Sequence, residues 1–449
     1  MTKKQPIQLS DHFTYGRLIR FVLPSVAMMI FTSIYGVVDG LFVSNFAGKT
    51  QLAAINLIFP LIMILGAIGF MIGTGGTAIV AKTLGMGDKK RANEYFSLLV
   101  YVAIVAGILL AVLGIVFARP ISELLGAKGE TAEYCTVYAR IVLAALPFFM
   151  LQNIFQSFCI TAEKPKLGLL ITVGAGCTNM VLDALFVAVF KWELVGAAAA
   201  TALSQVVGGI IPLIYFSMKN SSLLRLGKTR FYIGVLLRTC TNGSSELMSN
   251  ISSSVVTILY NGQLMRYAGE DGVAAYSAIM YVAFIFVAIF IGFAIGSSPI
   301  VSFHYGANNT SELKNLFKKS LWISAITGAL MTVSAMALSA PLSELFVGYD
   351  RALYEMTRHG FVIFAVHYIF AGTNIFGSAF FTALNNGAIS AIIAFLRTLV
   401  FQCASVMLLP LLFSDKLDGI WYSVIIAELL SFIITVIFLI AKRKKYQYA

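Results

Sequence analysis

Two aspartates stand in stretches of the sequence that are otherwise almost entirely apolar. Asp39 lies within residues 21–43, and Asp183 follows Asn179 by four residues in "TNMVLDALF". This spacing places Asn179 and Asp183 on one face of a helix. If Thr201 of "AAAATALSQ" packs beside them, the set holds two carboxylates, an amide and a hydroxyl. Such oxygens can coordinate a hard cation such as Na⁺, and neighbouring buried carboxylates can instead exchange protons.

Each group in this set also has a structural explanation. An arginine or lysine could hold either aspartate as a buried ion pair, although the basic residues of this half, apart from Arg140, fall near the ends of apolar runs. Asn179 and Thr201 could instead form hydrogen bonds between helices. Because an ionisable group deep in an apolar run is costly, we interpret the two acids as functional.

The second half of the chain also has ionisable residues in apolar surroundings. Arg397 could pair with an acid across its own half of the protein, which would make it structural, or it could belong to a site. A single histidine on a helix is more often a satisfied polar contact than a ligand. The four residues that form this possible polar site are Glu246, His367, Arg397 and Glu428.

Composition indicates an integral membrane protein. Of 449 residues, 59% are hydrophobic and 12% are charged, about half the charged fraction of a soluble domain. Apolar runs of twenty or more residues recur throughout, and each is long enough to cross a bilayer as a helix. We predict an all-α protein with twelve transmembrane helices, at residues 14–44, 51–81, 92–118, 131–159, 166–190, 194–218, 230–260, 273–303, 313–338, 352–382, 388–412 and 418–442.

The distribution of basic residues indicates which loops lie on the cytoplasmic side of the membrane. The N-terminus, the even-numbered loops and the C-terminus together carry 21 lysines and arginines, and the opposite side carries eight. Basic residues mark the cytoplasmic side, so both termini are predicted to be cytoplasmic in a multi-pass protein of the cell (inner or plasma) membrane. The net charge of +12 is therefore a topology signal. Membrane lipid is the expected surrounding, with no nucleic-acid partner, and the chain is predicted to be a monomer.

The two halves of the chain repeat each other. "RPISELL" at 119–125 returns as "APLSELF" at 340–346, and "TAEKPK" at 161–166 lies opposite "TALNNG" at 382–387. Because six helices are an even number, two such halves have the same orientation and enclose a cavity between them. A channel, or a duplication that serves only folding, is the alternative. The predicted parts are a cytoplasmic N-terminus (1–13), an N-lobe (14–218), a basic linker (219–229), a C-lobe (230–442) and a tail (443–449).

Motifs for soluble-type catalysis are missing from the sequence. It has no GxxxxGK[ST], no HExxH and no CxxC, and its five cysteines are not spaced like metal ligands. We therefore predict that the protein is not an enzyme, has no cofactor, and draws on an ion gradient rather than directly on ATP.

Four longer stretches carry a family resemblance. They are "SIYGVVDGLFVSNFAG", "GTGGTAIVAKTLGMGDKKRA", "TAEKPKLGLLITVGAGCTNMVLDALF" and "LVGAAAATALSQ". With these stretches, and over essentially its whole length, the chain resembles the multidrug and toxic compound extrusion (MATE) family of cation-coupled exporters, in its DinF-type and MepA-like prokaryotic branches. The resemblance implies two homologous six-helix bundles around a central cavity that opens alternately to the two sides.

The resemblance also implies roles for particular residues. Asp39, Asn179, Asp183 and Thr201 match the family's N-lobe ion site, which would take H⁺ or Na⁺, and Pro24 matches the position at which this branch bends its first helix. Glu246 matches an acid that coordinates Na⁺ in another branch. The companion aspartate of that branch is missing, because residues 352–382 contain no aspartate.

From these features we expect an antiporter that exports amphipathic, cationic drugs and toxic small molecules in exchange for H⁺ or Na⁺. The alternative within the wider superfamily is a flippase for lipids or lipid-linked oligosaccharides, which commonly has fourteen helices and a more basic cavity. The expected walls of the substrate cavity include Met28, Thr32, Tyr35, Gln152, Asn153 and Gln156.

Overall fold

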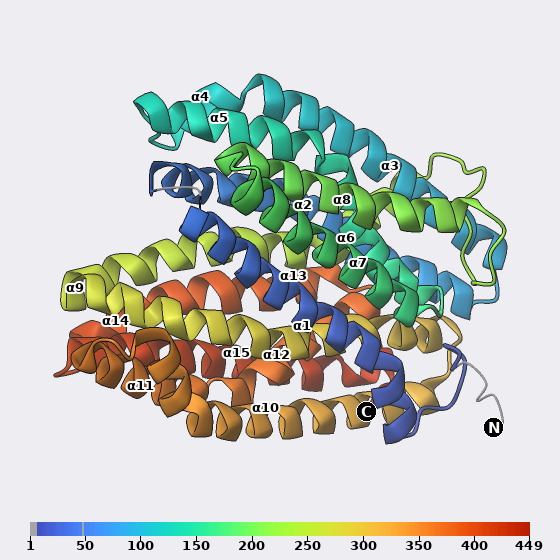
Figure 1. Ribbon diagram of the computed structural model, residues 1–449. Coiled ribbons are helices and arrows are strands. Elements are labelled where there is room, and N and C mark those ends of the chain that lie inside the picture. Colours follow the sequence, from blue (N-terminus) through green and yellow to red (C-terminus); the bar gives the residue numbers. More distant parts are fainter. Residues whose placement is uncertain (1–6, 47–48) are drawn as a thin grey trace, which may run out of the picture.

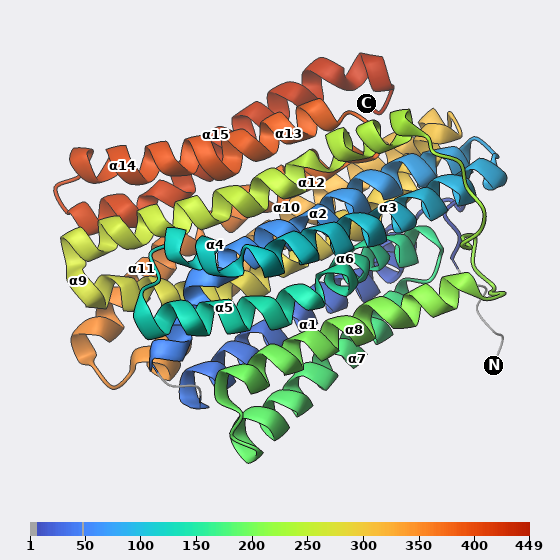
Figure 2. The same cartoon turned by 90° about the horizontal axis from the view of Figure 1, so that it is seen from above.

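The computed structural model describes residues 7–46 and 49–449 of the chain (Figure 1). Both described ends of the chain lie at the same end of the helical bundle, together with the linker between its two halves (Figures 1 and 2). We call this end, which carries Leu9, the linker 219–229 and Tyr448, the termini end.

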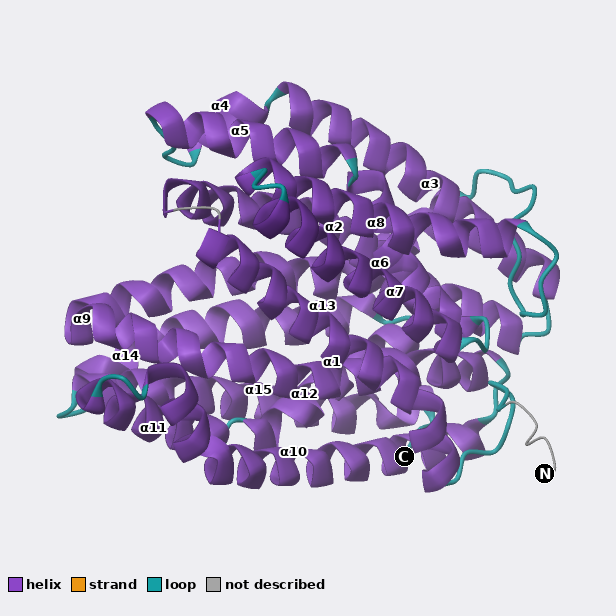
Figure 3. Cartoon of the chain, in the orientation of Figure 1, coloured by secondary structure: helices purple, strands orange, loops and turns teal. Residues whose placement is uncertain are grey.

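The described part of the chain consists of helices and the loops that join them, without a strand (Figure 3). The first half contains α1 (Tyr15–Phe46), α2 (Lys49–Gly85), α3 (Lys89–Val116), α4 (Ala118–Leu124), α5 (Gly129–Ala144), α6 (Leu146–Thr161), α7 (Pro165–Asp183), the π-helix η1 (Ala184–Val189) and α8 (Glu193–Ser217). The second half contains α9 (Ile233–Gly306), α10 (Thr310–Val347), α11 (Arg351–Ala365), α12 (Tyr368–Ala383), α13 (Gly387–Phe395), the π-helix η2 (Leu396–Phe401), α14 (Gln402–Leu412) and α15 (Lys416–Tyr446).

Twelve membrane crossings account for these helices. Among the described residues, nine helices are long and apolar enough to span a bilayer, and two bent pairs, α5 with α6 and α11 with α12, pass the same test together. The long helix α9 counts as two spans, because its backbone turns at Gly269 (φ 64°, ψ −151°). The positive φ suits glycine, which has no Cβ to clash there. The predicted all-α fold with twelve spans is confirmed.

Proline explains one of the two bends. The span formed by α5 and α6 changes direction by 53°, and Pro147 stands in the first turn of α6. Proline has no N–H to donate to the preceding turn, so it favours a new helix start at this point.

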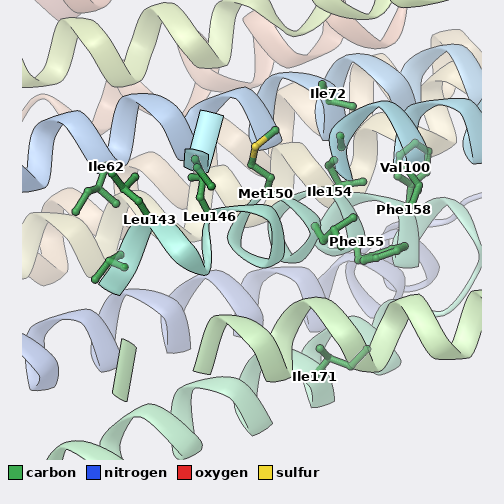
Figure 4. Packing of buried hydrophobic residues seen from close by; sticks show 14 of the residues in the cluster. Ile62, Ile72, Val100, Leu143, Leu146, Met150, Ile154, Phe155, Phe158 and Ile171 are labelled. Atoms are coloured by element: carbon green, nitrogen blue, oxygen red, sulfur yellow. The ribbon is translucent and has the colours of Figure 1, made fainter. Parts of the chain in front are cut away.

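Each half of the chain has a hydrophobic core of its own. The core of the N-lobe includes Phe96, Phe155 and Phe158, and part of it is shown in Figure 4. The core of the C-lobe includes Tyr260 and Trp421. Each of these five side chains is at most 2% exposed. Because lipid tails are as apolar as these side chains, the cores stabilise the bundles by close packing between helices.

Glycines bring the two lobes into backbone contact toward the termini end. A Cβ at Gly243 of α9 would overlap the carbonyl of Met71 in α2, and one at Gly306 would overlap the carbonyl of Lys82. In the part of α9 that follows Gly269, a Cβ at Gly292 would lie 2.5 Å from Cα of Val26 in α1. The lobes are therefore closed against each other on this side of the molecule.

Gly243→Ala tests this contact. The added methyl group has to push α9 away from α2, and such overpacking typically costs about 1–3 kcal/mol, so we expect a lower unfolding temperature of the purified protein. Gly234→Ala is the matched control, because no atom lies within 4 Å of its added Cβ. Equal unfolding temperatures for the two variants would contradict the backbone contact.

A short segment before α1, residues 7–13, joins both lobes at the termini end, and we call it the N-terminal strap. Two side chains of this strap, Leu9 and Phe13, are fully buried. The Leu9 N–H donates to Glu163 of the N-lobe (2.6 Å), and the Phe13 N–H donates to Glu312 of the C-lobe (2.9 Å). Burial raises the pKa of the Glu163 carboxyl group, and the bond from Leu9 partly offsets this. The strap thus ties the closed end together.

Candidate functional site

The N-lobe site is created by close packing of α1 on α7. A Cβ at Gly176 of α7 would lie 2.5 Å from Phe31 and 2.8 Å from Tyr35 of α1, so only glycine fits there. Asn179 stands one turn beyond Gly176 on α7, and Asp183 lies on the same side two turns beyond it. Asp39 follows Tyr35 by one turn on α1 and so faces these two residues.

The two aspartates form a pair of acids, of which Asp183 is buried and Asp39 is half-buried. Asp39 lies beside Asn179 and close enough to Asp183 for the two carboxyl groups to interact electrostatically. Asn179 is 2% exposed and Asp183 is completely buried. Both carboxyl oxygens of Asp183 and Oδ1 of Asp39 have no hydrogen-bond partner within the described structure. Two such acids need a shared proton or a bound cation to satisfy them.

No basic residue neutralises this pair among the described side chains. None of the ion pairs there includes Asp39 or Asp183, and Arg140 is exposed. The structural alternative for the two acids, a buried ion pair with arginine or lysine, is therefore not what the structure shows.

A tyrosine links the fourth predicted residue to the acids. Tyr138 of α5 interacts electrostatically with both Asp39 and Asp183 and lies beside Thr201 of α8. The Thr201 hydroxyl is itself buried without a hydrogen-bond partner in the described part of the chain. The structure therefore brings the two carboxylates, the amide and the hydroxyl close together, with Tyr138 as a neighbour that the sequence reasoning missed.

In each half of the molecule, the fifth span contains a short π-helix. In the N-lobe, η1 begins directly after Asp183. In the C-lobe, η2 contains Arg397. Such turns are rare and frequently occur at functional sites. Each lobe therefore has a π-helix next to an ionisable side chain, Asp183 in the N-lobe and Arg397 in the C-lobe.

The C-lobe polar residues form a neutralised network instead of an open site. Arg397 donates from Nε to both carboxylate oxygens of Glu428 (2.8 and 3.0 Å). Asn374 donates from Nδ2 to Oε2 of Glu428 (2.7 Å) and to its backbone carbonyl (2.9 Å). Of the alternatives for Arg397, the structure thus shows the ion pair with an acid of its own lobe.

The remaining histidine and glutamate of this region have other surroundings. His367 is buried, donates from Nδ1 to the Phe364 carbonyl (2.5 Å) and packs on Tyr368, which is a structural contact. Glu355, the acid of α11, pairs with Arg351 at the exposed start of the helix. It does not replace the missing aspartate.

A cavity of about 150 Å³ lies between the lobes near Glu246. Thr74 of α2 and Ser157 of α6 line it from the N-lobe, and most of the wall comes from α9, α12 and η2, including Arg397. The wall is mainly apolar, with residues such as Ile291. None of the ion pairs in the described residues includes Glu246, and the charged group that interacts with its carboxyl group is Arg397 of the same wall.

The residues predicted for the substrate-cavity wall are not among those that line this cavity. Met28 is 1% exposed and packs toward Gly168 of α7. Thr32 donates to the Met28 carbonyl (2.9 Å), and Tyr35 packs on Gly176. The three polar residues of α6 are buried within the N-lobe, at 2–6% exposure: Gln152, Asn153 and Gln156.

The first helix shows no break at the predicted bend. Pro24 lies inside α1, which continues from Tyr15 to Phe46. A proline removes one backbone hydrogen bond but does not by itself end a helix when neighbouring helices hold both sides. The state described by the structure therefore has a continuous first helix.

These features define a polytopic helical membrane protein of the two-bundle transporter type, with a cavity between the bundles and an unpaired acid cluster in one of them. A family model, MatE, matches residues 24–185 and 247–406. The chain belongs to the MatE family, and the resemblance found in the sequence is confirmed.

Individual relatives cover nearly the whole chain. Multidrug export protein MepA of Staphylococcus saprophyticus is 23% identical over 439 residues, covering 95% of this chain and 94% of the relative. MepA of Staphylococcus aureus (strain NCTC 8325) is 24% identical over 425 residues, covering 92% and 91%. Both are similar to this chain in length as well as in sequence.

Solved structures agree with the fold. One, described as the outward-facing conformation of a multidrug resistance MATE family transporter of the MOP superfamily, has a TM-score of 0.93 at 21% identity, with full coverage of both chains. A MOP superfamily transporter from Pyrococcus furiosus has a TM-score of 0.90 at 21% identity and full coverage. The arrangement of two bundles is thus shared.

Proposed function

We propose that this protein is an antiporter that exports amphipathic, cationic small molecules from the cell in exchange for H⁺ or Na⁺. The observation that carries this proposal is the acid pair Asp39–Asp183, three of whose oxygens are buried without a hydrogen-bonded or basic partner in the described structure. Such a pair takes up a proton or a cation whenever its pocket is exposed to one. The names of the MepA relatives support export of drugs.

Coupling follows from the difference between two states of the molecule. Uptake of one monovalent cation lowers the charge of the pair from −2 to −1, which relieves the cost of holding two like charges in a low dielectric. The ion drives transport only if the outward-open and inward-open forms bind it with different affinity. We propose that the packing of α1 on α7 supplies this difference, because Asp39 stands on α1 and Asp183 on α7.

The substrate is proposed to bind in the cavity at Glu246. Its apolar wall accommodates an aromatic or aliphatic body, and the Glu246 carboxylate attracts a positive charge. Glu428 cannot do so, because Arg397 already neutralises it. The cavity lies within one chain, so we propose a monomer as the working unit, in the cell membrane with the termini end in the cytoplasm.

Transport of a fluorescent cationic dye into everted membrane vesicles tests the proposal. With Na⁺ and H⁺ gradients clamped separately, we expect dye to accumulate against its own gradient under at least one of them, and the effective gradient identifies the ion. Flux that only runs downhill, and that neither gradient alters, would show a passive pathway and would contradict the antiporter.

A further inference from the structure

An open, mostly apolar groove lies on the C-lobe, outside the cavity described above. It consists of two adjoining hollows of about 540 and 470 Å³ that share Phe317, Leu321 and Ala325 of α10. These three residues are four apart, so they form one stripe along the helix. The other walls of the groove come from α12, α15 and the end of the chain, and they are mostly apolar: Ile369, Phe370, Phe432, Val436, Leu439, Ile440, Tyr448 and Ala449.

Three cations border the groove at the termini end. Lys314 and Lys318 extend the α10 stripe, and Arg443 faces it from α15. All three are exposed, and none takes part in an ion pair within the described chain. Their neighbour Lys319 is engaged elsewhere, because it donates to the Phe13 carbonyl (2.7 Å).

The groove contains a side chain that is typical of the edge of a bilayer. Trp322 lines one hollow and is 56% exposed, and tryptophan prefers the boundary between hydrocarbon and headgroups. Lys314 and Lys318 precede Trp322 on α10, on the side of the termini end, and the apolar stripe continues past Trp322 toward the hydrocarbon. One end of the groove is therefore suited to a negative headgroup and the rest to hydrocarbon.

We propose that this groove binds an anionic glycerophospholipid, with its phosphate at Lys314, Lys318 and Arg443 and its two acyl chains in the two hollows. Charge complementarity selects the anionic lipid, because three cations without an acidic partner attract a negative headgroup and gain little from a zwitterionic one. The inference does not depend on the transported substrate or on the coupling ion.

The first test changes the charges. The purified full-length chain is titrated in detergent with phosphatidylglycerol or phosphatidylcholine, and binding is counted by native mass spectrometry. We expect Lys314→Gln/Lys318→Gln/Arg443→Gln to weaken phosphatidylglycerol binding about a hundredfold and to leave phosphatidylcholine binding unchanged. The matched control, Lys219→Gln/Arg225→Gln/Lys228→Gln, removes the same charge from exposed positions of the linker and is expected to bind like the original protein.

The second test fills the groove without changing charge. Ala325 borders both hollows and is exposed, so Ala325→Phe occupies space meant for acyl chains. We expect it to reduce phosphatidylglycerol binding at least tenfold. Ala329→Phe, one turn along α10 and also exposed, is the control and is expected to leave binding intact.

Three results would overturn the proposal. If the linker variant lost as much phosphatidylglycerol binding as the groove variant, overall surface charge rather than the groove would hold the lipid. Equal affinity of the original protein for both lipids would remove the role of the three cations. A dimer that Ala325→Phe disperses, detected by analytical ultracentrifugation, would show that the groove seats a second copy of the chain.

Discussion

Vesicles that contain Asp183→Asn or Asp39→Asn are expected to lose substrate-driven ion exchange, at least tenfold, while the protein remains folded. An amide cannot take up and release a proton, and it binds Na⁺ more weakly than a carboxylate. The unfolding temperature should stay the same or rise, because a buried amide costs less than a buried carboxylate without partners. Exchange is measured as dye-elicited movement of H⁺ or Na⁺, with thermal unfolding on the same preparations.

Loss of transport with retained stability separates a coupling role from a structural one. Asp271→Asn is the matched control, since Asp271 is exposed near the turn within α9, and it should transport normally. Variants that unfold at a clearly lower temperature would make the two acids structural. Normal exchange in both variants would eliminate this coupling site.

Arg397→Met is expected to produce the opposite result, a large loss of stability. It leaves Glu428 buried with its charge opposed only by Asn374, and breaking one side of a buried ion pair typically costs about 3–5 kcal/mol. Adding Glu428→Gln should restore most of the unfolding temperature, because replacing both partners of such a pair is often nearly neutral. The measurement is thermal unfolding of the single and the double variant in detergent.

A second arginine of the same lobe provides the control. Arg351→Met breaks an exposed pair with Glu355 and should change the unfolding temperature little, because exposed ion pairs contribute little. A double variant as unstable as Arg397→Met alone would show that the charge of Glu428 is not the cause.

The spans could be predicted because bilayer thickness dictates the length of an apolar run. The predicted break at residues 261–272 was wrong in one respect: α9 stays helical there except at Gly269. Hydropathy marks where a helix leaves the hydrocarbon, whereas the helix itself ends only where backbone geometry requires it. The polar stretch around Arg266 is therefore a helix that extends beyond the membrane.

The polar cluster could be predicted in part for a related reason. Buried acids are rare enough in apolar runs that Asp39 and Asp183 were identifiable without neighbours. Periodicity gives the face of a helix but not what that face meets, so Met28 could not be told from a cavity residue, nor Tyr138 from a core residue. The strap could not be predicted from the sequence either, because Leu9 stands in a polar segment.

The strap has a consequence for how resistance would evolve in a population under drug selection. It holds the two lobes at one end without bordering the cavity at Glu246. A substitution at Glu163 or Glu312 would change how readily the lobes part, and so would scale export of every compound by a common factor. Substitutions in the cavity wall would instead favour one compound over another. Broad and narrow resistance would thus arise from different parts of the same molecule.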